Sequence, residues 1–102
     1  MRERWADYLI SAVRYNAAET HIEEVRVHDD LGDTVGPPLM IKRTTVVERL
    51  EGGYTFVTIV KSSDGSWRKG ARVRVVTVRG TKFIRTDADR TAEDNLGNLP
   101  RF

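Results

Sequence analysis

The sequence predicts an α+β domain: a small curled antiparallel sheet, or a partly closed barrel, with one short helix. Three observations support this fold class. Most apolar residues alternate with polar ones, one segment has helical spacing instead, and short connections join neighbouring strands. The 102 residues fit a single domain. We predict a core over residues 7–94 and a docked C-terminal tail over residues 95–102.

The chain begins with a predicted hairpin. Residues 7–15 alternate with period two, and residues 22–28 do the same after a short polar connection. The segment 29–38 contains two Gly, two Pro and three Asp, a composition typical of a loop.

A helix is predicted over residues 41–51, where apolar residues recur at helical spacing. Thr45 and Glu48 match a capping box at its start. Gly52 and Gly53 form a natural stop at its end.

The second half of the chain predicts three more strands. Residues 55–60 are rich in β-branched side chains, and residues 72–78 and 82–86 form a predicted hairpin around Gly80. In the 72–78 strand, Arg72 and Arg74 fall on the same face as Val76 and Val78, so the alternation is imperfect. Either both faces of this strand are covered or a bulge resets its register. The predicted order is strand–strand–helix–strand–strand–strand.

The composition excludes several classes of protein. The chain has no cysteine, so disulfides and thiolate catalysis are excluded. No apolar run approaches the length of about 18 residues that a membrane helix needs. The first residues do not resemble a signal peptide, and no phosphate-binding loop or nucleophile elbow occurs. We predict a cytoplasmic protein with no cofactor and no membrane contact.

The charge is strongly polarised along the chain. Residues 61–85 carry eight basic residues and one acidic residue, a net charge of +7 in a chain whose total is +2. Residues 1–51 carry seven basic and ten acidic residues. Such a basic segment attracts phosphates or acidic surfaces, and its aromatic residue suits the stacking of bases. The candidate contact residues are Trp67, Arg68, Lys69, Arg72, Arg74, Lys82 and Arg85.

A structural interpretation of the same residues stays open. Trp67 can cap the core, and the arginines can keep an exposed strand soluble and discourage edge pairing. His21 and His28 are seven residues apart, which on a strand places them on opposite faces, so they are not predicted to share a metal ion.

The acidic residues after the last strand are a second candidate site. Asp87, Asp89 and Asp94 offer carboxylates for acid–base chemistry or a hard cation, but Asp in such segments usually caps backbone amides. Asn95 and Asn98 favour a tail that hydrogen-bonds onto the sheet, or the rim of a ligand site.

Three segments, residues 12–16 with His21 and Ile22, residues 82–88 and residues 94–100, carry a family resemblance. Together they resemble the bacterial family catalogued as domain of unknown function 3892, over nearly the whole chain. The resemblance implies a stand-alone small bacterial protein and supplies no catalytic or binding residue. The chain departs from it at Lys42, where the family leads us to expect a Ser or Thr helix cap.

From these observations we expect a small non-catalytic binding module that uses its basic half. Its partner would be an acidic protein surface or single-stranded nucleic acid. One alternative is a small-ligand binder or enzyme that uses Asp87 and Asp89. Another is a self-associating structural protein with an exposed edge strand.

Overall fold

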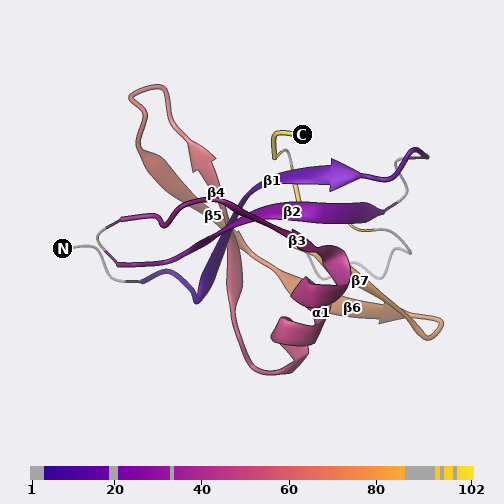
Figure 1. Cartoon of the computed structure of the whole chain (residues 1–102). Coiled ribbons are helices and arrows are strands. Elements are labelled where there is room, and N and C mark those ends of the chain that lie inside the picture. Colours follow the sequence, from indigo (N-terminus) through magenta and orange to yellow (C-terminus); the bar gives the residue numbers. More distant parts are fainter. Residues whose placement is uncertain (1–3, 19–20, 33, 87–93, 95, 98) are drawn as a thin grey trace.

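The computed structural model describes residues 4–18, 21–32, 34–86, 94, 96–97 and 99–102. Within them the chain forms one helix and seven strands in two sheets (Figure 1). The elements are β1 Tyr8–Tyr15, β2 Ile22–Asp29, β3 Leu39–Lys42, α1 Arg43–Glu51, β4 Phe56–Lys61, β5 Trp67–Arg72, β6 Arg74–Val78 and β7 Thr81–Arg85. The α+β class with one short helix is confirmed, and the sheet is open rather than closed into a barrel.

The larger sheet has the strand order β3-β2-β1-β4-β5, and β6 and β7 form a separate two-stranded sheet. All strand pairs are antiparallel except β1 with β4, which run parallel. The prediction of a wholly antiparallel sheet was therefore wrong for this pair. A parallel pair needs a crossover connection, and the segment containing α1 supplies it.

Strand β3 was not predicted, and it takes the first residues of the predicted helix. Ile41 pairs with Val25 of β2, so residues 41 and 42 are extended and α1 begins at Arg43. Lys42 is the N-cap residue and makes no side-chain cap hydrogen bond. The prediction of a capping box at Thr45 and Glu48 was therefore wrong. The pairing of β3 with β2 fixes where the helix begins.

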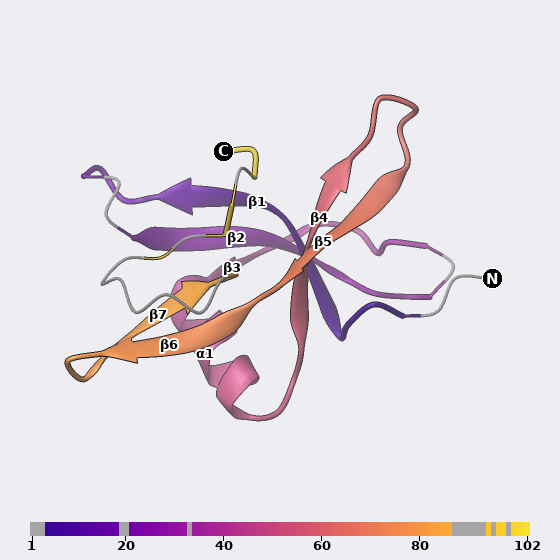
Figure 2. The same ribbon diagram turned by 180° about the vertical axis from the view of Figure 1, so that it is seen from behind.

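The predicted strand 72–78 is divided at Val73. Arg72 ends β5 and Arg74 begins β6, while Val73 is buried and its N–H donates to the carbonyl of Phe56 at 2.9 Å. Figure 2 shows β5 running directly into β6. Arg72 therefore belongs to the large sheet, and only Arg74 shares a strand with Val76 and Val78.

The main core lies between the large sheet, α1 and the β6–β7 hairpin. Its largest fully buried side chains include Phe56, Ile10, Ile22 and Ile84, and α1 contributes Val46 and Val47. A smaller cluster of Ala6, Leu9, Val57 and Ile59 is partly covered by Trp5, Val35 and Trp67. Leu9 on β1, and Val57 and Ile59 on β4, alternate with residues of the main core, so this part of the sheet is buried on both faces.

The C-terminal residues lie along the free part of β1. Pairing between β1 and β4 ends at Ile10, and beyond it the β4–β5 hairpin diverges from β1 and β2 (Figure 1). There the Val13 N–H donates to the carbonyl of Pro100 at 2.9 Å, and the Phe102 N–H donates to that of Val13 at 3.1 Å. Leu96 and Leu99 are buried in the main core.

Candidate nucleic-acid interface

Three cationic and two aromatic residues line the surface where β5 leaves the large sheet and continues as β6. We call this surface the basic strip: Trp5, Tyr54, Lys69, Arg72 and Arg74. Two grooves meet on it and share Arg72. A groove of about 320 Å³ is lined by Trp5, Thr55, Val57, Lys69, Gly70 and Arg72. A groove of about 470 Å³ is lined by Leu50, Glu51, Gly53, Tyr54, Arg72, Val73, Arg74 and Val75. Arg72 therefore lines both the groove that contains Trp5 and the groove that contains Tyr54.

The cations of the basic strip are available to a partner. Lys69, Arg72 and Arg74 are exposed, and none of them forms an ion pair with a described residue. The acidic residue of the larger groove, Glu51, is already neutralised, because its Oε2 lies 2.6 Å from Nζ of Lys82. The strip therefore keeps a net positive charge.

Gly70 lets β5 approach β4 closely at the strip. A Cβ at this position would lie 2.2 Å from Oγ1 of Thr58 and 2.8 Å from its carbonyl oxygen. The same Oγ1 accepts a hydrogen bond from the N–H of Ala71 at 3.0 Å. The absence of a side chain at Gly70 thus fixes the path of β5, and with it the positions of the neighbouring cations.

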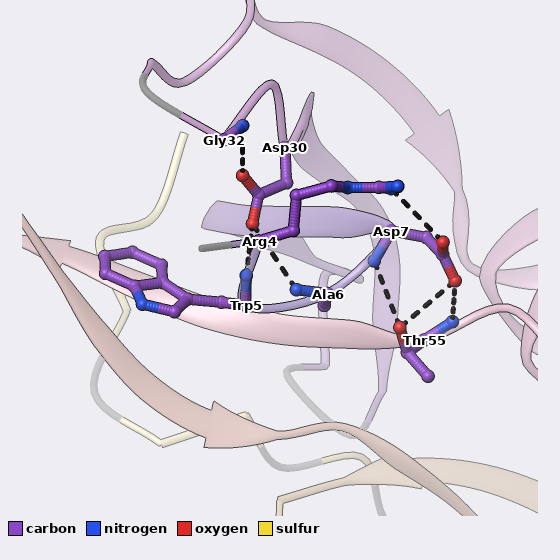
Figure 3. A network of polar contacts seen from close by, with 7 residues as sticks. All are labelled: Arg4, Trp5, Ala6, Asp7, Asp30, Gly32 and Thr55. Atoms are coloured by element: carbon purple, nitrogen blue, oxygen red, sulfur yellow. Dashed lines mark hydrogen bonds and ion pairs between the residues drawn. The ribbon is translucent and has the colours of Figure 1, made fainter. Parts of the chain in front are cut away.

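A network of polar contacts holds the N-terminal segment that carries Trp5 (Figure 3). The N–H of Trp5 donates to Oδ2 of Asp30 at 2.6 Å, and the N–H of Ala6 donates to the same oxygen at 3.4 Å. The other oxygen of Asp30 accepts from the N–H of Gly32 at 3.0 Å. The backbone at Trp5 is thereby fixed against the loop after β2.

Asp7 and Thr55 fasten the same segment to the start of β4 (Figure 3). The N–H of Thr55 donates to Oδ2 of Asp7 at 2.8 Å, and the N–H of Asp7 donates to Oγ1 of Thr55 at 3.0 Å. The backbone N–H of Thr55 lowers the pKa of Asp7 from its ordinary value of 3.8, and partial burial opposes the shift. Hydrogen bonds to the ionised carboxylate thus stabilise the position of the strip.

The structure does not bring all predicted contact residues onto one face. Trp67 and Lys69 are two residues apart on β5 and share a face, whereas Arg68 faces the opposite way. Lys82 lies at the α1 side, where it pairs with Glu51. Arg85 is only 3% exposed, so its burial does not favour a place in a contact surface. Its strand packs against the core, which outweighs the polarity of the residue type.

Trp67 is half-buried and lies outside both grooves of the strip. It packs against the smaller hydrophobic cluster, and its ring centroid lies 5.8 Å from that of His28. The ammonium group of Lys61 lies over the indole at 5.4 Å. These contacts fit the structural interpretation, in which Trp67 covers the core.

Neither Trp5 nor Tyr54 was among the contact residues predicted from the sequence. Trp5 precedes the first strand, where no periodicity indicates which way its side chain points. Tyr54 is 51% exposed, which is unusual for a large aromatic residue. In the sequence, these residues are marked only as aromatic side chains close to the start of a strand, which does not indicate a binding surface.

The remaining candidate residues have structural roles or lie outside the described residues. Asp94 is buried and accepts hydrogen bonds from the backbone N–H groups of Ile22 and Ile84, both at 2.8 Å. Asp87, Asp89, Asn95 and Asn98 fall outside the described part of the chain. Among the described residues, no group of three or more His, Asp or Glu side chains is placed to hold a metal ion.

Comparison with known proteins identifies a family for this chain. A family model described as "Protein of unknown function (DUF3892)" matches residues 9–100. No curated protein and no solved structure matches the chain. Among the described residues, no helix has the length and apolar character that crossing a membrane requires.

Proposed function

Because the chain belongs to the DUF3892 family, whose description assigns no activity, we propose from its surface that it binds single-stranded nucleic acid through the basic strip. The observation that carries this proposal is the position of Arg72 between two grooves, with Trp5 in one and Tyr54 in the other. Alternating cations and aromatic rings are what a single strand needs, because phosphates pair with cations while bases stack on rings.

The aromatic side chains favour nucleic acid over an acidic protein surface. The cations alone would suit an acidic protein, whereas a single strand also stacks its bases on an exposed ring such as that of Tyr54. Tyr54 also lies beside Tyr8, with ring centroids 5.8 Å apart, and the guanidinium of Arg49 lies over Tyr8 at 4.8 Å. This cluster extends the cation–aromatic surface toward the end of α1.

A fluorescence titration tests this proposal. The chain has two tryptophans, so the variant Trp67→Phe leaves Trp5 as the only indole reporter. Titrating it with single-stranded DNA and RNA at about 50 mM salt, where the electrostatic attraction is strong, should quench its emission. The variant Trp5→Ala should bind more weakly by about 1–3 kcal/mol, which is the loss that alanine substitution of one stacking residue causes.

A charge-matched pair of variants locates the interface. Arg74→Glu changes a cation of the strip, whereas Arg68→Glu makes the same change on the opposite face of β5. The proposal requires binding to fall much more for Arg74→Glu. Equal losses, or no binding to any single strand at about 50 mM salt, would exclude this interface. Binding to an acidic polypeptide alone would identify the other predicted partner.

Three further expectations from the sequence, on location, on a ligand or catalytic site and on self-association, stay predictions. A cytoplasmic location is part of this proposal, and it rests on the cysteine-free sequence. The ligand-binding or enzymatic alternative at Asp87 and Asp89 lies outside the described residues. Self-association through an edge strand remains open for β3, whose Leu39 and Met40 are exposed.

A further inference from the structure

We propose that Ser11 and His28 form a nucleophile–base pair that cleaves small anionic esters, at a groove separate from the basic strip. Oγ of Ser11 lies 2.7 Å from Nε2 of His28, and both residues are buried. This distance is within the hydrogen-bond range that a serine nucleophile and its general base require. The inference is independent of the proposed nucleic-acid binding.

Ser11 lies at a bulge in β1, beside the strand β2 that carries His28. Ile10 pairs with Val27 and Ala12 pairs with Arg26, so Ser11 is the extra residue between two consecutive pairs. A bulge of this kind re-aims a side chain, and bulges are common beside active sites. Without it, Ser11 would have a regular cross-strand partner.

A backbone carbonyl fixes the tautomer of His28. Nδ1 of the ring lies 2.8 Å from the carbonyl oxygen of Gly36, which can only accept a hydrogen bond. In the neutral ring the proton is therefore on Nδ1, and Nε2 presents its lone pair to the hydroxyl of Ser11. Gly36 is itself held, since its N–H donates to the carbonyl of Asp29 at 3.0 Å. A third group thus orients the base, as in serine hydrolases.

Ser11 opens onto a groove that has cations and an apolar wall. The groove measures about 390 Å³ and is lined by Ser11, Arg26, Val60, Lys61, Trp67 and Pro100. Its two cations favour a substrate with a carboxylate or phosphate group, and they also favour the oxyanion that forms during acyl transfer. Ser11 is only 6% exposed, so the acyl group must be small.

The reaction conserves atoms and charge. Oγ of Ser11 bonds to the ester carbonyl carbon while Nε2 of His28 takes the hydroxyl proton. The tetrahedral intermediate then expels the alkoxide, which takes that proton and leaves as an alcohol. Water next attacks the acyl-serine, again giving its proton to Nε2. The carboxylic acid is released, the proton returns to Oγ, and the pair is regenerated.

A fluorophosphonate reagent tests the nucleophile in the unmodified protein. It should modify Ser11 in preference to the other serines, as mapped by mass spectrometry of the digested chain. Ser63, which is exposed, is a matched control, and Ser63→Ala should leave labelling unchanged. Failure to label Ser11, or equal labelling of Ser11 and Ser63, would overturn the proposal.

Two variants test the base and the charge preference. His28→Gln should slow labelling of Ser11 by at least about a hundredfold, the lower range for loss of a general base, while circular dichroism confirms its fold. Lys61→Gln should reduce hydrolysis of 4-nitrophenyl hemisuccinate more than that of uncharged 4-nitrophenyl acetate. Equal reductions for the two esters would contradict the predicted preference for anionic substrates. Unchanged labelling in His28→Gln would show that the hydrogen bond is structural only.

Discussion

Arg43 and Asp94 form a two-contact ion pair that joins the start of α1 to the C-terminal segment. Nε of Arg43 lies 2.6 Å from Oδ2, and Nη2 lies 3.1 Å from Oδ1. The carboxylate is fully buried, and it also accepts the N–H groups of Ile22 and Ile84. The guanidinium additionally donates to the carbonyl of Lys82. One side chain therefore connects β2, α1 and β7.

The first prediction concerns this ion pair. Asp94→Ala should lower the free energy of unfolding by roughly 3–5 kcal/mol, because it leaves a partly buried guanidinium and two backbone N–H groups without their acceptor. Urea denaturation measures the loss. Glu48→Ala removes an exposed carboxylate from the same helix and should change stability by less than about 0.5 kcal/mol. A loss below about 1 kcal/mol for Asp94→Ala would contradict this role.

The second prediction concerns the C-terminal residues. Leu99 is only 7% exposed and packs in the main core, so Leu99→Ala should cost about 2–5 kcal/mol. The control is Pro100→Ala, since its exposed ring can be removed while its carbonyl still accepts from Val13. It should change stability by less than about 1 kcal/mol. Equal melting temperatures for the wild type and Leu99→Ala would show that this contact does not form in solution.

The third prediction concerns Gly70. Gly70→Ala should destabilise the domain by about 1–3 kcal/mol, because the new methyl group collides with Thr58 and pushes β5 away from β4. The double variant with Thr58→Ala removes the nearer collision but leaves the carbonyl oxygen at 2.8 Å. It should therefore relieve only part of the strain of the added methyl group. Nuclear magnetic resonance should show the shifts concentrated in β4 and β5.

The fourth prediction concerns the stability of the fold at low pH. Hydrogen bonds from the hydroxyls of Ser62 and Ser66 lower the pKa of Asp64 to about 2, and Thr55 lowers that of Asp7. A carboxyl whose pKa is lower in the folded state stabilises the fold above its unfolded pKa of 3.8, and this contribution is lost as pH falls toward the folded value. Carbon-detected titration should place Asp64 near 2.

Ser62→Ala provides the matched test, because it should raise the pKa of Asp64 toward 3.8 and leave Asp7 unchanged. An Asp64 carboxyl that titrates near 3.8 in the wild type would rule out the turn network. Stability measured between pH 2 and pH 4 should fall less steeply in Ser62→Ala.

The fifth prediction concerns how the affinity for a single strand depends on salt concentration. If Lys69, Arg72 and Arg74 each neutralise one phosphate of a single strand, the slope of log affinity against log salt should be about −2. Arg72→Glu combined with Arg74→Glu should abolish binding and preserve the fold, since both side chains are exposed. Loss of folding in the double variant would show instead that these arginines stabilise the domain.

Local pattern was sufficient for most strands. The hairpin of β1 and β2, the strand at residues 56–61 and the hairpin of β6 and β7 follow from period-two alternation and short turns. Strand β5 was missed because Trp67–Arg72 is almost wholly exposed and half of its residues are charged, so no apolar alternation marks it. Backbone pairing with β4, rather than burial, makes this segment a strand.

The basic segment was visible in the sequence, but its distribution in space was not. Charge along the chain identified Lys69, Arg72 and Arg74, and it could not separate them from buried Arg85. The pairing of Ser11 with His28 was equally inaccessible, because the two residues are 17 positions apart in the sequence and meet only through the pairing of β1 with β2.

The sequence by itself determined the fold class, the family and the polarity of charge, since these depend on residue type and short-range periodicity. Only the tertiary structure decided that β1 and β4 pair in parallel, that the chain changes sheets at Val73, and that Trp5 and Tyr54 flank Arg72. The reason is physical: side-chain chemistry is local, whereas burial and cross-strand neighbours depend on contacts between residues far apart in the chain.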